Sequence, residues 1–287
     1  MCDEEEFNKE LLPKYINDFL GYGNLKAKYW FVGEEENGGC SICEVNALLD
    51  VWNDRGRKNI EDMICVSGIL ESIKPDYRKF ENFFGKETRD IEIQPVWGQI
   101  IKLLLSYKDN INLSSDVIDE NIIKDFQKNN FGRGNGEIFS MNLFPLPFNK
   151  SKGWIYGSSE ISCLNTNSKS YKNKPAKYVN KMLPYRIGKI KDLIKKHNPE
   201  FVNFYCYTYK DSIKDEFDEV IFCNIPAEVG IAYKGGNKKI SFYIGNFNKT
   251  TISISHHSTG LRCKKEDKMK YLWKLVDKMK EYNAKVN

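Results

Sequence analysis

The sequence predicts an α/β protein with three layers (α/β/α), in which a mostly parallel central sheet lies between two layers of helices. Short apolar runs rich in aromatic and β-branched residues alternate with longer segments whose apolar residues recur at helical spacing. The clearest strand is the run 29–33, and three carboxylates, Glu34 to Glu36, follow it at once. Because ligands of open α/β sheets bind at the carboxyl ends of strands, these acids mark a candidate site. A solvated acidic turn is the simpler alternative.

The apolar patterns place the expected elements along the chain. Helices are expected at 7–19, 43–52, 94–107, 110–126, 186–197, in the segment up to 217, and at 265–282. Strands are expected at 29–33, 138–144, 201–205, 220–223, 240–245 and 251–255. Residues 21–24 should break the chain, and residues 53–90, which show no clear period, should form loops and short helices.

Length and charge bound the class of protein. The chain has 287 residues, 41% of them hydrophobic, so we expect one domain over residues 1–287 with a sizeable core. The net charge is only +5, but residues 150–198 contain twelve Lys or Arg against two acids. This segment includes an expected basic, irregular insertion at about residues 149–184. Basic residues interleaved with aromatic ones, such as Trp154 and Tyr156, suit a nucleic acid. A lysine-rich solvated insertion is the alternative.

Targeting and redox signals are few. The acidic N-terminus does not resemble a secretory signal, and no apolar run approaches the ~18 residues of a membrane span. We therefore expect a cytoplasmic protein with reduced thiols and no membrane association. Among eight cysteines, Cys40 and Cys43 form the only close pair, and a second such pair is missing. We expect no metal and no cofactor, and the oligomeric state stays open.

Two further polar groups follow strands. Asn142 lies in the apolar run 138–144, before Pro145 and Pro147, where an unpaired amide would cost about 1–3 kcal/mol. Neighbouring backbone could satisfy it, or it could read the paired donor and acceptor of a ligand. The last strand ends in His256 and His257. A lone His is usually structural, whereas a His pair at a strand end is as consistent with a functional role as with a structural one. On a parallel sheet the three strand ends would meet at one edge.

These segments together resemble the uracil-DNA glycosylase superfamily, over about residues 25–280. Its catalytic motif follows the first strand, as Gly-Gln-Asp-Pro-Tyr-His or Gly-Glu-Ala-Pro-Gly, and its counterpart here is residues 33–38, Gly-Glu-Glu-Glu-Asn-Gly. The superfamily's base-reading Asn, followed by a proline-bearing loop, corresponds to Asn142 and residues 145–149. Its late motif, His-Pro-Ser-Pro, corresponds to residues 256–259, His-His-Ser-Thr. The prolines of the first and last motifs are missing here, and the insertion has no counterpart in the compact uracil enzymes.

The resemblance implies a role for each matching residue. Glu35, with Glu34 as its rival, would stabilise positive charge at C1′ and orient water, and His256 would assist the departing base. Asn142, with Gly33 and Asn37, would bind a base that has left the helix. Leu261 resembles the wedge residue that fills the vacated stack. The residues expected to contact DNA are Ser258, Leu261, Arg262, Lys150 and Lys152.

The resemblance defines the substrate class less closely than it defines the roles of these residues. The missing proline and the glycines of the first motif predict a roomy pocket, and some relatives in phage defence excise bulky modified cytosines. We therefore expect a DNA glycosylase for damaged or modified bases, with glucosylated hydroxymethylcytosine of phage DNA as the leading candidate. The alternatives are a uracil-DNA glycosylase of base-excision repair, a non-catalytic DNA-binding module of the same fold, and a phosphoryl-transfer enzyme that holds Mg²⁺ with its acids.

Overall fold

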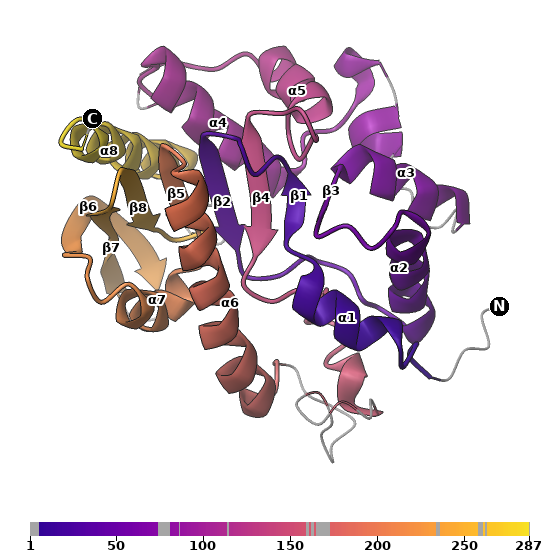
Figure 1. Cartoon of the computed structure of the whole chain (residues 1–287). Helices are drawn as coiled ribbons and strands as arrows, with labels where there is room; N and C mark the ends of the chain where they lie inside the picture. The colour runs from indigo at the N-terminus through magenta and orange to yellow at the C-terminus, as the bar shows by residue number, and fades with distance from the viewer. Residues whose placement is uncertain are drawn as a thin grey trace.

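One mixed sheet forms the centre of the molecule in the computed structural model (Figure 1). The structure describes residues 6–73, 81–85, 87–113, 115–158, 161, 164, 173–233, 236–257, 261 and 263–286. The strands within this part of the chain are β1 (Gly21–Gly23), β2 (Tyr29–Gly33), β3 (Ile60–Glu61), β4 (Ile138–Asn142), β5 (Phe201–Phe204), β6 (Cys223–Tyr233), β7 (Gly236–Phe247) and β8 (Thr250–Ile254). Their order across the sheet is β3-β1-β4-β2-β5-β8-β7-β6.

The helices connect these strands. They are α1 (Leu11–Asp18), α2 (Ile42–Asp54), α3 (Met63–Ile73), α4 (Pro95–Asp109), α5 (Glu120–Asn129), α6 (Ala176–His197), α7 (Lys210–Glu216) and α8 (Lys265–Asn283). Short turns of other helix types lie at Glu81–Gly85, Thr88–Asp90, Ile155–Ser158 and Tyr207–Tyr209. None of the helices in the described ranges combines the length and the apolar character that a bilayer span requires.

The middle of the sheet is parallel, and its flanks are partly antiparallel. Strands β4, β2, β5 and β8 run in the same direction, in a register that aligns Gly33 with Asn142 and Phe204 with Ile254. Strand β1 is antiparallel to β4, and β7, which forms a long hairpin with β6, is antiparallel to both β6 and β8. The expected mostly parallel sheet is therefore correct at its centre. Of the expected strand 220–223 only Cys223 lies in a strand, where the long hairpin strand β6 begins.

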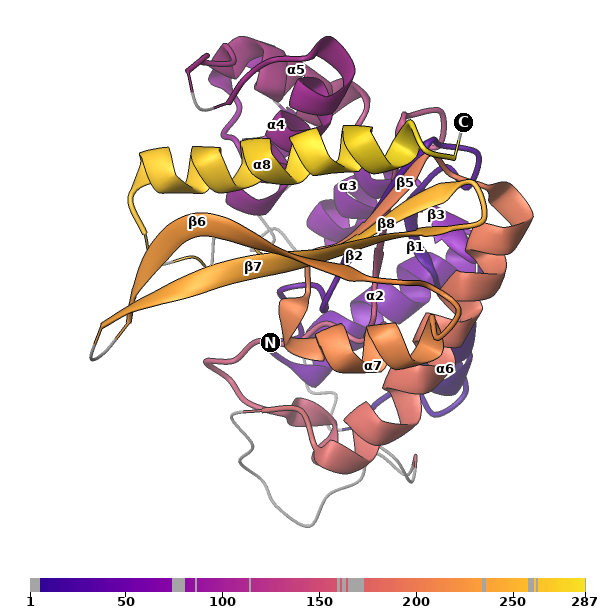
Figure 2. The same cartoon turned by 90° about the vertical axis from the view of Figure 1, so that its left-hand side faces the viewer.

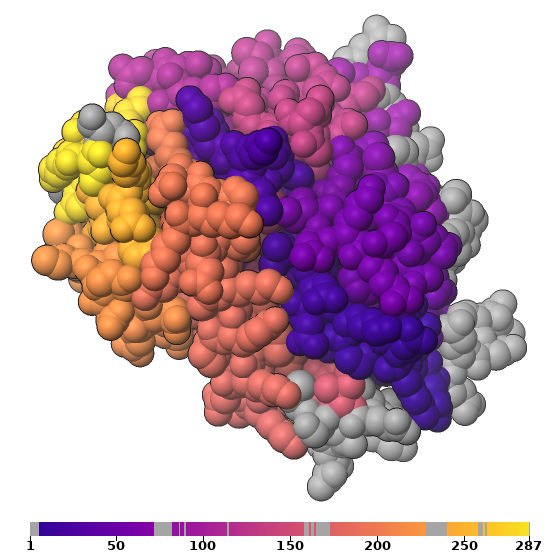
Figure 3. All heavy atoms as spheres, in the orientation of Figure 1, coloured from indigo at the N-terminus to yellow at the C-terminus, as the bar shows by residue number. Residues whose placement is uncertain are grey.

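Helices cover both faces of the sheet, as the three-layer prediction requires. Figure 2 shows α4 and α8 on one face and α6 and α7 on the other. The apolar residues of β2 between these layers, Trp30 to Val32, are fully buried. In Figure 3 the atoms of α6 run down one face of the molecule beside the N-terminal elements. The contact between α6 and the N-terminal elements includes a hydrogen bond, which Lys189 of α6 donates to the carbonyl oxygen of Asn17.

Three elements differ from the sequence expectation. The glycines expected to break the chain lie in β1 instead. They allow β1 to pair closely with β4, since a Cβ at Gly23 would overlap the Ile138 carbonyl oxygen of β4. Helix α3 occupies part of the segment expected to be irregular. Helix α6 begins at Ala176, ten residues before the expected start, and runs through Pro184 because Tyr178, Met182 and Leu183 continue its buried stripe.

The basic segment after β4 is folded against the body where it is described. Trp154, Tyr156 and Tyr178 are buried there and pack on one another, with Trp154 about 4.9 Å from each of the other two rings. Trp154 and Tyr156, which the sequence offered as part of a nucleic-acid surface, are therefore part of the core and not exposed for such a contact. Trp52 of α2 is also buried and donates a hydrogen bond to the Lys58 carbonyl.

A buried arginine joins the N-terminal segment, β4 and α6. Arg186 is fully enclosed, and its guanidinium donates hydrogen bonds to the carbonyl oxygens of Phe19, Leu20 and Asn142. Burial lowers the pKa of Arg186 to about 10. Each bond to a charged donor is worth about 1.5–3 kcal/mol, so this residue holds the carboxyl end of β4 in place.

Candidate active site

The parallel strands bring the three marked segments to one edge of the sheet. The acid loop after β2 is joined to the chain after β4 by backbone hydrogen bonds, each 2.9 Å long. Leu143, Phe144 and Phe148 donate these bonds to the carbonyls of Gly33, Glu34 and Glu36. The chain after β5 is held in the same way, since Tyr205 donates to Val32. The backbone alone therefore fixes the position of the acids relative to Asn142.

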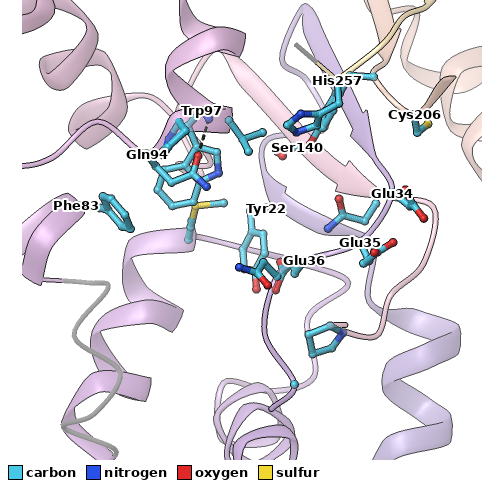
Figure 4. A pocket seen from close by; sticks show the side chains of 18 of the residues that line it. Tyr22, Glu34, Glu35, Glu36, Phe83, Gln94, Trp97, Ser140, Cys206 and His257 are labelled. Atoms are coloured by element: carbon cyan, nitrogen blue, oxygen red, sulfur yellow. Dashed lines mark hydrogen bonds between the residues drawn. The ribbon is translucent and has the colours of Figure 1, made fainter. Parts of the chain in front are cut away.

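A large cavity opens at this edge (Figure 4). Its volume is about 1160 Å³. The residues predicted from the sequence that line it are Glu34, Glu35, Asn37, Asn142, Lys150, His256 and Leu261. An acid, an amide and an imidazole from three distant parts of the chain therefore face one space, which is the arrangement that the sequence predicted.

The two acids share one buried ammonium group. Lys174 Nζ donates to Glu34 Oε1 at 2.6 Å and to Glu35 Oε2 at 2.7 Å. The Lys174 side chain is only 6% exposed and that of Glu35 only 9%, against 30% for Glu34. Tyr209 adds a hydrogen bond to Glu34 Oε1 at 3.1 Å. Two carboxylates and one ammonium leave the cluster with one formal negative charge when both acids are ionised.

This environment separates the two carboxyl groups. Burial and the neighbouring Glu34 raise the pKa of Glu35 to about 7, against the opposing effect of Lys174. Burial also acts on Glu34, but hydrogen bonding and charge from Lys174, with Lys150 and Tyr209 behind them, lower its pKa below the ordinary value. Neighbouring titratable groups with separated pKa values are typical of an acid–base site.

Asn142 presents its side chain to the cavity. No group in the described ranges forms a hydrogen bond with this amide, although Arg186 binds the residue's backbone carbonyl. A Cβ at Gly33 would lie 2.7 Å from Asn142 Oδ1 and 2.5 Å from the Tyr205 hydroxyl oxygen. A side chain at position 33 would therefore have to displace the Asn142 amide, the Tyr205 hydroxyl or both. The amide has the donor and acceptor that a nucleobase edge offers in return.

The two histidines occupy different surroundings. The ring of His256 is stacked on that of Tyr207, with ring centres 3.8 Å apart. The ring of His257 lies 5.5 Å from that of Tyr205 and points into the cavity in Figure 4. Burial lowers the pKa of His257, and the charge of Glu34 acts on it in the opposite direction. Both line the cavity, and His257 interacts electrostatically with Glu34.

The remaining predicted residues are distributed unevenly. Leu261 is buried in the cavity wall, so it would have to leave this position to fill a vacated base stack. Lys152 is exposed and does not line the cavity, whereas Lys150 is exposed at its rim. Ser258 and Arg262 lie outside the described residues, and their predicted contacts with DNA stay predictions.

The cavity extends well beyond the acids into a second lobe. Its walls come from α3, the turn before α4, and α4 itself, and they are mainly apolar and aromatic. The lining residues of this lobe are Met63, Val66, Leu70, Phe83, Phe84, Pro95, Val96 and Trp97. Gln94 adds a side-chain amide whose oxygen accepts from the backbone N–H of Trp97, as the dashed line in Figure 4 shows.

Sequence reasoning missed three residues of this site. Lys174, Tyr205 and Tyr209 come from an irregular segment and from a strand end that carried no motif. Lys174 was one of twelve basic residues in its segment, so composition could not separate it from solvated lysines. The only available signal was position, since Tyr205 directly follows a strand that is parallel to β2.

The thiols differ from the expectation of a fully reduced set. Cys40 is exposed and accepts a hydrogen bond from Asn149 at 3.1 Å, but Cys43 is disulfide-bonded. The described residues contain no group of three or more His, Cys, Asp or Glu side chains arranged to hold a metal ion. The oxygens of Glu34 and Glu35 have an ammonium partner instead.

Comparison of the chain with protein-family models, with curated proteins and with solved structures gives no match. The basis for a function is therefore the geometry of the cavity and of the residues that line it.

Proposed function

We propose that the protein is a DNA glycosylase that hydrolyses the N-glycosidic bond of an extruded, damaged or modified base. One observation carries the proposal. Glu35, Asn142 and the histidine pair come from three separate strand ends, which lie far apart in the sequence, and all of them line one cavity. The likeness of these segments to uracil-DNA glycosylase motifs supports the same class.

The chemistry assigns a task to each group. As the bond between C1′ and the base breaks, the base leaves with the electron pair and the sugar gains positive charge. Glu34, ionised by its contact with Lys174, stabilises that charge. Glu35 accepts a proton from the water whose oxygen forms the new bond to C1′. A carboxylate with a pKa of about 7 is well suited to this role near neutral pH.

A neutral imidazole completes the site. We assign stabilisation of the departing base to His257, with His256 as the alternative that the sequence favoured. Because burial lowers its pKa, His257 is mainly neutral at pH 7 and can donate a hydrogen bond to an oxygen of the leaving base. One such donor is worth about 2.7–4 kcal/mol of barrier. Asn142 binds the base edge before the reaction begins.

The cavity favours a large base over plain uracil. Its volume of about 1160 Å³ exceeds the ~300–1,000 Å³ usual for pockets that hold drug-sized ligands. An unmodified pyrimidine at Asn142 would leave the second lobe empty. Glucosylated hydroxymethylcytosine in phage DNA is therefore our leading substrate, and uracil is the second.

The decisive experiment measures abasic sites. Purified protein is incubated with glucosylated phage DNA, with uracil-containing DNA and with unmodified DNA, and strand breaks are counted after alkali treatment. We expect breaks in the glucosylated DNA, and loss of these breaks in the double variant Glu34→Gln, Glu35→Gln. Lys285→Met, at an exposed lysine in the turn after α8 and outside the basic segment, serves as the control. Absence of breaks in all three DNAs would contradict the proposal.

A non-catalytic DNA-binding module of the same fold is the competing function. It would bind DNA with the same salt sensitivity but leave every base in place. The charge-paired acids disfavour it, because a binding module gains nothing from burying the Glu35 carboxylate and partly burying that of Glu34 in the same cavity.

A further inference from the structure

We infer that Lys174 is a positioning residue that holds Glu34 and Glu35 side by side and makes the basic segment an integral part of the site. The inference rests on the proposed function for its kinetic consequence, but its structural part can be tested without any substrate. Nothing in the sequence distinguished this lysine from the other basic residues around it.

Lys174 is a buried counter-ion of Glu34 and Glu35. Its ammonium reaches one oxygen of each acid at 2.6 Å and 2.7 Å, and its side chain is 6% exposed. The same group lies 4.8 Å from the centre of the Phe144 ring and 5.2 Å from that of Phe148. Aromatic faces attract a cation, so four groups from the two strand-end loops converge on one amine.

Enclosure on this scale has a clear electrostatic consequence. Two adjacent carboxylates repel each other strongly once water is excluded, and only an opposite charge between them allows both to ionise. Both acids line the cavity and Lys174 does not, so the lysine binds the pair without occupying the substrate space. The groups that face the pair are Lys174, Lys150, Tyr209, Cys206 and His257.

The position of Lys174 in the chain also connects the two acids to the basic segment and to α6. It stands two residues before α6, at the end of the segment that carries the predicted DNA-binding lysines Lys150 and Lys152. Pro175 follows it as the cap of α6, with φ near −60°. Because α6 is packed on the sheet and anchored by Arg186, the lysine is delivered from a rigid element and not from a free loop.

The first test is thermal stability as a function of pH. Lys174→Met should lower the melting temperature much more at pH 8, where both acids tend to ionise, than at pH 5. In the double variant Lys174→Met, Glu35→Gln this pH-dependent loss should disappear, because no second carboxylate remains to be repelled. Lys177→Met, at an exposed lysine on α6, should show no such pattern. Equal losses at both pH values, unrelieved by Glu35→Gln, would overturn the inference.

The second test is kinetic and uses DNA on which the wild type is active. Single-turnover base release by Lys174→Met should fall at least tenfold at pH 7, and its pH profile should move by about one unit to higher pH. Lys174→Arg, which keeps the charge, should restore most of the rate. An unchanged profile in Lys174→Met would overturn the inference, whereas wild-type inactivity with the expected thermal pattern would reject the proposed function alone.

Discussion

At the scale of single residues, the buried carboxyl of Glu35 is the most informative group. Its side chain is placed beside Glu34 with little access to water, and both features favour its protonated form. A site that needs a base near neutral pH gains from this placement, whereas a turn that only needs solubility does not. The same feature therefore affects catalysis and stability in opposite directions.

The rate of base release should follow the ionisation of Glu35. Since the proposed base must be deprotonated, the single-turnover rate should rise about tenfold per pH unit below pH 7 and level off above it. Glu34, whose pKa is lowered, is already ionised over this range. Measurement between pH 5 and 9 on the preferred DNA checks this profile. A rate that falls as pH rises through 7 would assign Glu35 the role of an acid.

The same shift predicts a stability effect of the opposite sign. A carboxyl whose folded-state pKa is raised adds stability below its unfolded value, about 4.5, and loses it as pH rises toward about 7. Glu35→Gln should therefore raise the melting temperature at pH 8 by about 2 °C or more, with little change at pH 5. Activity should fall at least 100-fold in the same variant. A lower melting temperature at pH 8 would contradict this reading of the carboxyl.

Gly33 gives a residue-scale test of the amide. Gly33→Ala would push a Cβ against Asn142 Oδ1 and the Tyr205 hydroxyl, so base binding should weaken. We expect KM to rise at least tenfold, since one lost pair of hydrogen bonds is worth about 1–3 kcal/mol. Asn142→Ala should show a similar rise. A Gly33→Ala variant with unchanged KM would remove the base-reading role from this amide.

At the scale of elements, β1 depends on close approach to β4. A Cβ at Gly23 would overlap the Ile138 carbonyl, and the residue also has φ +112°. Gly56 has φ +86° with no atom near its missing Cβ, so it carries the backbone strain without the clash. Gly23→Ala should therefore cost clearly more stability than Gly56→Ala, which should cost about 1 kcal/mol. Urea unfolding of both variants measures the difference, and equal losses would contradict it.

Much of the element order was predictable because strong apolar periodicity survives in the sequence. Strand β2, helix α4 and helix α8 lie within two residues of their expected bounds. The misses have identifiable physical causes. Helix α5 begins at Glu120, capped by Asp119, after a stretch that was wrongly included in it. The hairpin strand β7 begins with polar and charged residues, so its apolar alternation is visible only from Ile240 onward.

The candidate site was predictable only in part for the same reason. Glu35, Asn142 and the histidine pair each follow an apolar strand, and parallel strands gather their ends. No such pattern in the sequence identifies Lys174, the counter-ion of the acids, or Tyr205, whose hydroxyl lies beside Gly33. Their roles depend on distances between segments remote in sequence, such as the 140 positions between Glu34 and Lys174.

At the scale of the whole molecule, the basic segment predicts salt-dependent binding of DNA. Neutralising phosphates releases counterions, so the logarithm of affinity should fall linearly with the logarithm of salt concentration. Lys152→Ala should lessen the slope by about one, because one exposed cation is removed. Lys285→Ala, in the turn after α8, should leave the slope unchanged. Fluorescence anisotropy at several salt concentrations measures both, and identical slopes would move the binding surface elsewhere.

The enclosed guanidinium of Arg186 has a consequence for anyone who shortens this protein. Its three carbonyl partners belong to residues 19, 20 and 142, and the first two precede every strand of the sheet. A version that lacks residues 1–20 would leave the charged guanidinium of Arg186 in an apolar interior without two of its three partners, beside the backbone of Asn142. Such truncations should yield insoluble product, and the leading twenty residues are best kept in any recombinant form.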